Sequence, residues 1–230
     1  FGQFAPMRKK ISYAASVPNG SIPEAEQEYF KNALASLAHI SVREEKLALA
    51  VEKLTGKEVT TVVDPTLLLE KADYEDLLYR DRIVKEKYIF AYYVVENEML
   101  SKCAQRAAEA YGYRLIELHY KKTPKIKGEN MIFDAGPSEF LTYIRDAELV
   151  LTNSFHGTVF SVLFQKLFYS VYKENGRITN LLTFLNLERR HIETDAKMDF
   201  KDKIDYTTVA EKLCSYREKS VEYLEKGIEQ

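Results

Sequence analysis

The sequence predicts an α/β protein built from parallel sheets. Strand-like and helix-like segments alternate along its 230 residues, as expected where helices connect parallel strands. Tyr88–Val95 is a continuous apolar run of strand length, which is typical of a strand buried on both faces. A third observation lies at residues 149–164, where a short apolar run, a polar cluster around His156 and a second apolar run follow one another. This pattern predicts a strand, a tight turn and a buried helix.

The first third of the chain predicts three strands and two helices. The clearest helix is 44–55, in which Leu47, Val51 and Leu54 recur at helical spacing. Gly56 follows it at the position where a left-handed residue commonly ends a helix. The other predicted elements are the strands 11–15, 39–42 and 59–63 and the helix 24–38.

The rest of the chain predicts a second sheet that begins with Tyr88–Val95. A helix with Cys103, Ala104 and Ala107 on one face follows it and ends at Gly112. Pro137 suits the first turn of the next helix, since proline lacks only an N–H that has no partner there. The last helix opens at a capping box of Thr208 and Glu211. The remaining predicted elements are the strands 114–118, 131–133, 149–152 and 167–171 and the helix 137–147.

The domain organisation follows from these elements. The charged segment 79–87 is the predicted junction, so residues 1–84 form an N-terminal domain and residues 85–205 a C-terminal domain. Residues 206–230 are expected to form a helix that crosses back to the first domain. Because a strand already begins at Ile11, we expect the first domain to be incomplete, with its N-terminal part missing.

Composition favours a soluble protein. The chain is 46% hydrophobic and 30% charged, which suffices for one large or two small domains, and its net charge of −2 argues against binding nucleic acid. No apolar run approaches the roughly twenty residues of a membrane span, and no signal peptide is visible, so we expect a cytoplasmic location. The lysine-rich segment 121–127 is either a solvated loop or a contact with a phosphate or lipid headgroups. Contact with the inner face of the membrane is thus expected to be peripheral at most.

No metal site is predicted. Cys103 and Cys214 lie far apart without the spacing of metal ligands and are expected to be buried free thiols. Glu117, His119 and Asp134 likewise lack a spacing typical of a metal site.

His156 is the central candidate for function. It lies in a predicted strand-to-helix turn at the carboxyl edge of a parallel sheet, where open α/β folds bind ligands. Free amides at the start of a helix suit a phosphate or carboxylate, and hydrogen bonds are expected from Asn153, Ser154 and Thr158, with the Gly157 and Thr158 amides beside them. The alternative interpretation of a lone histidine is a surface or hydrogen-bonded structural residue.

The segment Thr152–Thr158 resembles the signature of the polysaccharide pyruvyl transferase family. Further family-like segments follow one another in the same order along the chain and together span residues 11 to about 190. The resemblance implies a fold like that of GT-B glycosyltransferases, in which two Rossmann-like domains face a cleft. The other segments are Ile11–Ser16, Ile40–Glu44, Val63–Leu68, Gly136–Leu141 and Asn175–Ile178.

The resemblance also implies an activity. Members transfer the pyruvyl group of phosphoenolpyruvate to two sugar hydroxyls in polysaccharide biosynthesis, forming a ketal. The implied partners are phosphoenolpyruvate as donor substrate and a sugar or lipid-linked oligosaccharide as acceptor, with no cofactor. Arg43 and Arg177 would hold the donor and His156 would act as general acid, since arginine binds carboxylate and phosphate through two hydrogen bonds.

Four other residues belong to the predicted site. Lys173 is a substitute for Arg177 if the loop register differs, and Phe155 and Gly157 complete the turn around His156. Asp64 is either a cleft residue or a structural turn, because Asp-Pro is also a common way to end a strand. Arg43 has a structural alternative too, as a surface arginine paired with the glutamates that follow it.

Two other functions compete with pyruvyl transfer. The first is a glycosyltransferase of GT-B type that uses a nucleotide sugar, although no clear base or ribose pocket is visible. The second is a non-catalytic module that binds a glycan or an anion.

Overall fold

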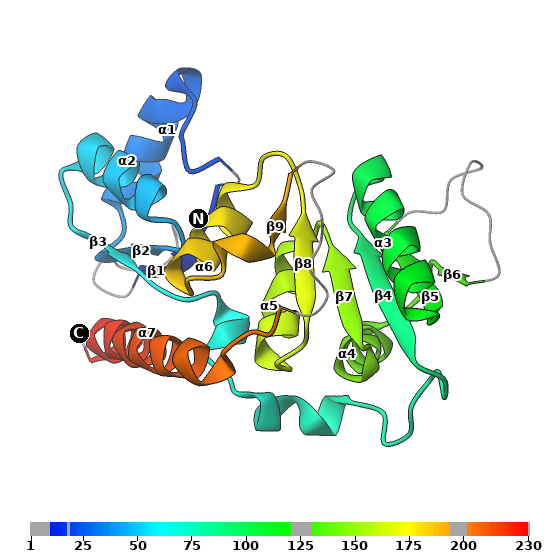
Figure 1. Ribbon diagram of the computed structural model, residues 1–230. Helices are drawn as coiled ribbons and strands as arrows, with labels where there is room; N and C mark the ends of the chain where they lie inside the picture. The colour runs from blue at the N-terminus through cyan, green and yellow to red at the C-terminus, as the bar shows by residue number, and fades with distance from the viewer. Residues whose placement is uncertain (1–9, 18, 121–129, 194–201, 230) are drawn as a thin grey trace. The chain divides into compact units, whose positions relative to one another are not determined.

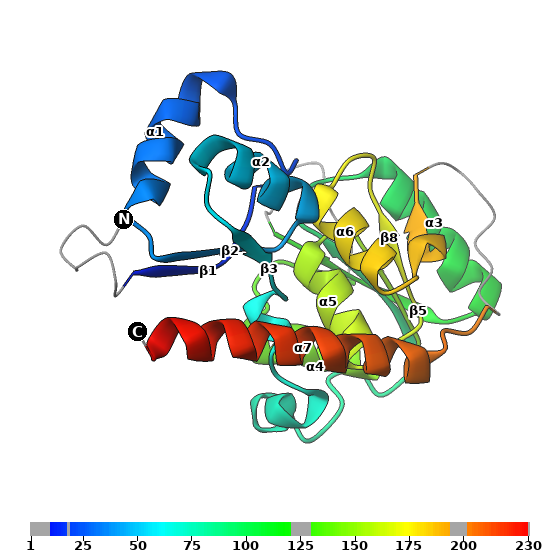
Figure 2. The same cartoon turned by 90° about the vertical axis from the view of Figure 1, so that its left-hand side faces the viewer.

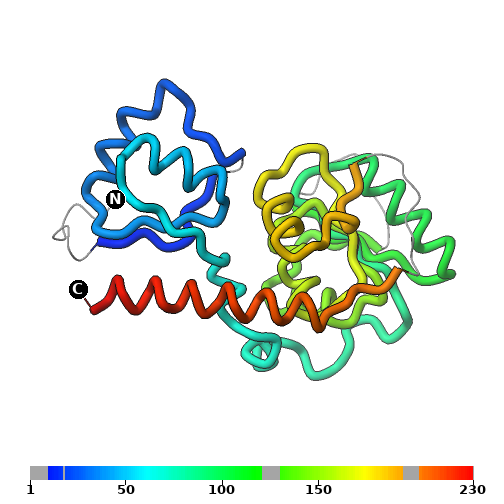
Figure 3. The backbone as a smooth tube through the Cα atoms, turned by 60° about the vertical axis from the view of Figure 1, so that its left-hand side comes forward, coloured from blue at the N-terminus to red at the C-terminus, as the bar shows by residue number. Residues whose placement is uncertain are grey.

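The protein divides into two compact units. The computed structural model describes residues 10–17, 19–120, 130–193 and 202–229 (Figure 1). Residues 1–68, 174–185 and 207–230 form the first unit, and residues 69–173 and 186–206 form the second. The chain thus returns twice to the first unit, the second time through the long C-terminal helix that is red in Figure 3. The lysine-rich segment 121–127 lies outside the described residues.

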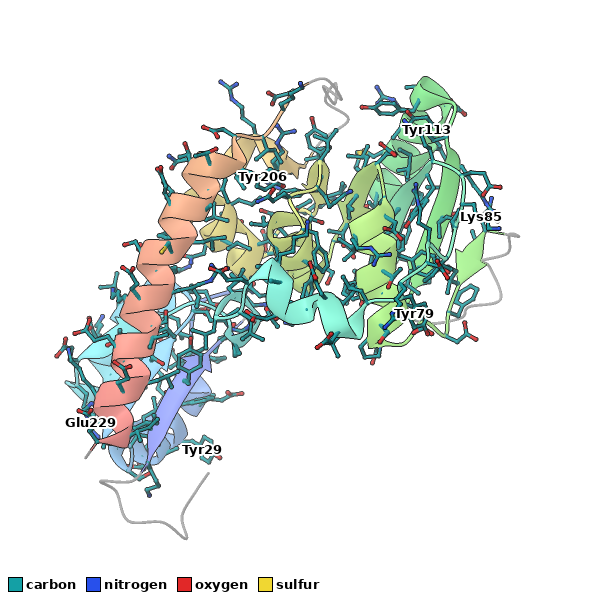
Figure 4. The ribbon with its side chains drawn as sticks, turned by 90° about the horizontal axis from the view of Figure 1, so that it is seen from below. Tyr29, Tyr79, Lys85, Tyr113, Tyr206 and Glu229 are labelled. Carbon is teal, nitrogen blue, oxygen red and sulfur yellow. The ribbon has the colours of Figure 1, made fainter. Side chains whose placement is uncertain are left out.

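This division differs from the predicted domain boundaries at two places. It falls between residues 68 and 69 instead of 84 and 85, and residues 174–185 group with the first unit. The first difference has a local cause, because the expected linker packs on the second unit. There, the Tyr79 amide donates to Thr142 Oγ1 (3.0 Å) and Arg82 donates to the Asp146 carbonyl (2.9 Å). Figure 4 labels Tyr79 beside helix α4 (Pro137–Asp146), which carries Thr142 and Asp146.

The first unit is a parallel sheet between helices (Figure 2). Helices α1 (Glu24–Ala35) and α2 (Glu45–Thr55) pack on one face through an apolar cluster that includes Ile40 and Leu47. On the other face, Tyr223 of α7 (Tyr206–Ile228) packs against Ala14 and Val62. Among the described residues the strand order is β1 (Ile11–Ala15), β2 (His39–Val42) and β3 (Val59–Thr61).

Polar contacts also hold α7 on this sheet. Ser220 Oγ accepts a hydrogen bond from the Val63 amide (3.0 Å), and the Tyr223 hydroxyl donates to the Ser12 carbonyl (2.7 Å). The helix begins at Tyr206, so the predicted capping box at Thr208 lies inside the helix and does not mark its start.

The second unit is a doubly wound α/β domain. Alternate residues of β4 (Tyr88–Tyr93) face opposite layers of the domain. Ile89 packs in the apolar cluster that contains Cys103 of α3 (Glu98–Tyr111), whereas Phe90 stacks on Tyr143 of α4 (Pro137–Asp146). Every strand pairing in this sheet is parallel. Within the described residues the strand order is β6 (Met131–Ile132), β5 (Arg114–His119), β4 (Tyr88–Tyr93), β7 (Leu149–Thr152), β8 (Phe168–Val171) and β9 (His191–Ile192).

The structure differs from the sequence predictions in several additional elements and in the exposure of one cysteine. Cys103 is buried as predicted, but Cys214 is exposed on α7, so the prediction of two buried thiols was wrong for Cys214. No helix in the described part of the chain is both long and apolar enough to cross a membrane. The unpredicted elements are α6 (Gly176–Phe184), β9 and the 3₁₀ segments Pro65–Leu67, Lys71–Leu77 and Glu188–Arg190.

Candidate functional site

The turn between β7 and α5 (Phe155–Leu163) is held by Thr152. Its hydroxyl donates to the Tyr92 carbonyl of β4 (2.9 Å) and accepts from the Ser154 amide (3.0 Å). Thr152 is fully buried, so these two bonds fix the direction in which the chain leaves the sheet.

Asn153 joins this turn to the neighbouring strand. Its Oδ1 accepts from the Val94 amide (2.9 Å), and its Nδ2 donates to the Val95 carbonyl (2.7 Å). In the order β6-β5-β4-β7-β8-β9, successive connections run in opposite directions from β4 and β7. The carboxyl ends of these two strands are thus the topological switch point, where open α/β sheets bind ligands.

Three small residues start helix α5. Ser154 is the N-cap, and its Oγ accepts from the Gly157 amide (3.1 Å). Thr158 Oγ1 donates to the Ser154 carbonyl (3.0 Å) and lies 2.7 Å from Ser170 Oγ. A Cβ on Gly157 would lie 2.5 Å from Thr152 Oγ1, so only glycine lets the helix approach the strand this closely.

His156 is the one exposed side chain between Leu149 and Phe164, all of which the structure describes. The preceding Phe155 is buried, and its ring meets the imidazole edge-to-face at 5.4 Å between centroids. The turn therefore presents a single titratable group at the switch point of the second unit. Asn153, Ser154 and Thr158 have the internal partners given above, and their role as ligand contacts stays a prediction.

A second group of predicted residues lies in the first unit. Arg43 follows β2, and its Nη1 donates to Asp64 Oδ2. Asp64 also caps the 3₁₀ segment 65–67, where its Oδ1 accepts from the Thr66 amide (3.0 Å) and hydroxyl (2.6 Å). Asp64 therefore caps the turn that follows β3, and it also pairs with the candidate arginine.

Arg177 belongs to the same unit as Arg43. It lies in the first turn of α6, which Asn175 caps by accepting from the Ile178 amide (3.3 Å). From the same helix, Asn180 Nδ2 donates to the Arg43 carbonyl (3.1 Å). The sequence placed Arg177 on the sheet edge that carries His156. Arg177 lies instead in the unpredicted helix α6, which belongs to the first unit together with Arg43.

Glu44 is the residue of this group that sequence reasoning missed. It is only 3% exposed, and its Oε1 accepts from Ser16 Oγ (2.6 Å). Burial raises the pKa of Glu44, while the Ser16 hydrogen bond and the charges of Arg43 and Arg177 act in the opposite direction. Its position beside Arg43 was the available signal, but a glutamate at a helix start is usually solvated.

Lys173 is exposed and follows β8 in the second unit, apart from the unit that holds Arg177. Among the described residues, no group of three His, Cys, Asp or Glu side chains is placed to hold a metal ion.

Sequence comparison decides the family. The family model described as polysaccharide pyruvyl transferase matches residues 3–173, well over half of the chain. The chain belongs to the polysaccharide pyruvyl transferase family. The predicted resemblance of the chain to this family is thereby confirmed. No curated protein matches the sequence.

Solved structures show the fold that this pyruvyl transferase family member shares with GT-B enzymes. A protein assigned as a UDP-N-acetylglucosamine 2-epimerase from Listeria monocytogenes matches with a TM-score of 0.51 and 10% identity, over 91% of this chain and 60% of that one. The Methanocaldococcus jannaschii UDP-GlcNAc 2-epimerase matches with a TM-score of 0.41 and 13% identity, over 85% and 55%. Phytolacca americana UGT2 matches with a TM-score of 0.41 and 12% identity, over 95% and 58%. The chain thus spans less than two thirds of each of these structures. The predicted α/β fold of GT-B type is confirmed.

Proposed function

We propose that this protein transfers the pyruvyl group of phosphoenolpyruvate to two hydroxyls of a sugar in a cell-surface polysaccharide or its precursor. The family match supports this class of reaction. The observation that carries the proposal is the isolated exposure of His156 at the switch point of the second unit, where every neighbouring side chain from Leu149 to Phe164 is buried. An imidazole can donate and accept a proton near neutral pH, as both halves of the reaction require.

The donor carries a carboxylate and a phosphate close together, which suits two arginines. A guanidinium binds either group through two parallel hydrogen bonds, and its charge does not depend on pH. We assign this role to Arg43 and Arg177, which lie in one unit and both act electrostatically on Glu44. Asp64 holds the Arg43 guanidinium in place.

The proposed chemistry begins with transfer of a proton from the imidazolium of His156 to C3 of the donor, which turns its methylene into a methyl group. C2 then carries the developing positive charge and is attacked by the first sugar hydroxyl. The C2–O bond to phosphate breaks, and the second hydroxyl closes the ketal at the same carbon. The two hydroxyls lose two protons, of which one restores the imidazolium and the other leaves with the phosphate.

The proposal includes the partners and the location. The proposed acceptor is a sugar or a lipid-linked oligosaccharide, and phosphoenolpyruvate is the donor. The proposal includes no metal or cofactor. The reaction takes place in the cytoplasm, where phosphoenolpyruvate is made, with at most peripheral contact with the membrane.

A thermal-shift titration separates the proposal from its competitors. Phosphoenolpyruvate is expected to raise the melting temperature, whereas uridine and guanosine diphosphates are not, because binding to the folded state alone stabilises it. Stabilisation by a nucleoside diphosphate instead would favour a nucleotide-sugar glycosyltransferase.

Turnover tests the role of His156. Acceptor-dependent release of phosphate from phosphoenolpyruvate is expected to fall by a factor of about 100 or more in His156→Asn, the usual scale for loss of a general acid. Donor binding is expected to survive, since the amide keeps the shape of the turn. Unchanged turnover in this variant would remove His156 from the reaction. Donor binding by the wild type without any turnover would instead point to a binding module.

A further inference from the structure

Glu44 is a buried carboxyl with an unused oxygen. Glu44 lies between β2 and α2 as the N-cap residue of that helix, yet its side chain accepts no hydrogen bond from the first-turn amides. Ser16 satisfies Oε1, whereas Oε2 is buried and has no hydrogen-bond partner in the described part of the chain. An unpartnered oxygen of an ionised carboxylate costs more free energy than almost any other buried polar atom. This cost favours either protonation of the carboxyl group at Oε2 or a hydrogen bond that a bound ligand donates to Oε2.

The cationic side of the cluster is also incomplete. Arg177 acts on Glu44 electrostatically from α6, and its Nε is buried without a hydrogen-bond partner among the described residues. Asp64 already pairs with Arg43. Counting Arg43 and Arg177 against Asp64 and an ionised Glu44, the cluster carries no net charge.

A neutral cluster binds an anion poorly, because the attraction of the arginines is cancelled by the carboxylates. Protonation of Glu44 changes this in two ways: it leaves one net positive charge, and it turns Oε2 into a hydrogen-bond donor. Burial raises the pKa of Glu44 already in the absence of an anion. Among the residues that the structure describes, the charged or titratable groups that act electrostatically on this carboxyl include Arg43 beside it, Arg177 of α6 and the phenol of Tyr216 of α7.

We propose that Glu44 takes up a proton from solvent when a dianion binds beside Arg177, so that anion binding by the first unit is coupled to protonation of this buried carboxyl. No bond in the anion forms or breaks in this step. The inference rests on the proposed function only in taking the arginine pair as the anion site. Because binding takes up a proton, this coupling makes the affinity for the anionic donor substrate fall as the pH rises.

Sulfate is the suitable probe, because it stays fully ionised across the range and contributes no proton of its own. The full chain is titrated with sulfate by calorimetry between about pH 5 and about pH 8, a range that starts above the ordinary pKa of glutamate. Two buffers with different enthalpies of ionisation give the number of protons taken up. We expect proton uptake in the wild type, and an affinity that falls by up to about tenfold per pH unit above the pKa of Glu44.

Two variants locate the proton. Glu44→Gln keeps the shape of the protonated side chain, so it is expected to bind sulfate without the linked proton and with little dependence on pH. Ser16→Ala removes a hydrogen bond that lowers the pKa of Glu44, and it is expected to move the fall in affinity to higher pH while keeping the linked proton. Circular dichroism checks that each variant folds.

The outcomes separate this inference from the proposed function. Proton uptake that is absent in the wild type, or unchanged in Glu44→Gln, would overturn the coupling and leave the arginine pair as the donor site. A wild type that does not bind sulfate at the lowest pH would overturn both the coupling and the assignment of the arginines. Pyruvyl transfer that fails while the coupling is measured would overturn the proposed function alone.

Discussion

Gly157→Ala tests the packing that presents His156. The added methyl carbon would lie 2.5 Å from Oγ1, 3.0 Å from Cγ2 and 3.1 Å from Cβ of Thr152. Thr152 is fully buried and cannot swing toward solvent. Overpacking of this kind costs about 1–3 kcal/mol. If Thr152 rotates away, the buried groups that lose their hydrogen bonds to its hydroxyl add a cost of about 1–3 kcal/mol. Alanine recovers about 1 kcal/mol through its higher helix propensity.

A contact of 2.5 Å forces Thr152 to shift, so both costs apply, and the expected result is a net loss of about 1–5 kcal/mol in the free energy of unfolding. Urea unfolding followed by far-UV circular dichroism measures it against Gly136→Ala. In that control the new Cβ meets only the end of the flexible Glu139 side chain, at 2.9 Å. The clash should shrink in a Thr152→Ala background, because that substitution removes the two nearest atoms. Equal stability of Gly157→Ala and Gly136→Ala, or additive effects in the double variant, would refute this account of the turn.

Three further predictions concern the first unit and the thiols. The folded state raises the pKa of Glu44, so the wild type should lose stability relative to Glu44→Gln as the pH rises from about 4.3, the ordinary pKa of glutamate, through the folded pKa. Melting temperatures of both proteins across this pH range measure the difference in stability. A difference that stays constant with pH would contradict the prediction. Ser220→Ala leaves the buried Val63 amide without its partner and should cost about 1–3 kcal/mol in urea unfolding, whereas a change within experimental error would show that α7 does not depend on this bond. In the native protein Ellman's reagent should modify Cys214 rapidly and Cys103 only after denaturation, and two equally fast thiols would contradict the burial of Cys103.

The α/β fold was predictable because its strands carry strong local patterns. Tyr88–Val95 is apolar throughout, since both faces of β4 are covered, and the structure places β4 at Tyr88–Tyr93. Helix α2 was equally clear, and it ends at Gly56, whose φ of 69° is left-handed as expected of a C-cap. Helix α6 was missed although its N-cap, Asn175, is a usual signal of a helix start. Gly176 opens the helix and its first turn contains no acidic residue, so the remaining signals were weak.

The candidate site was harder to predict than the fold. The polar residues around His156 suggested ligand contacts, and the structure shows that Asn153, Ser154 and Thr158 also make internal hydrogen bonds that shape the turn. A short hydroxyl or amide side chain has the same appearance in a sequence whether it binds a ligand or caps a helix. Arg177 and Glu44 illustrate the same limit, because their proximity depends on the return of residues 174–185 to the first unit, which no local pattern reveals.

The central claim is that the arginine pair of the first unit binds phosphoenolpyruvate. Calorimetric titration with phosphoenolpyruvate tests it in the wild type, in Arg177→Ala and in Arg189→Ala, an exposed arginine outside this cluster that serves as the control. The account predicts saturable binding that Arg177→Ala weakens by about tenfold or more, the loss expected for a hydrogen bond between charged groups, and that Arg189→Ala leaves unchanged. Equal affinities in all three proteins, or no binding by the wild type, would contradict it.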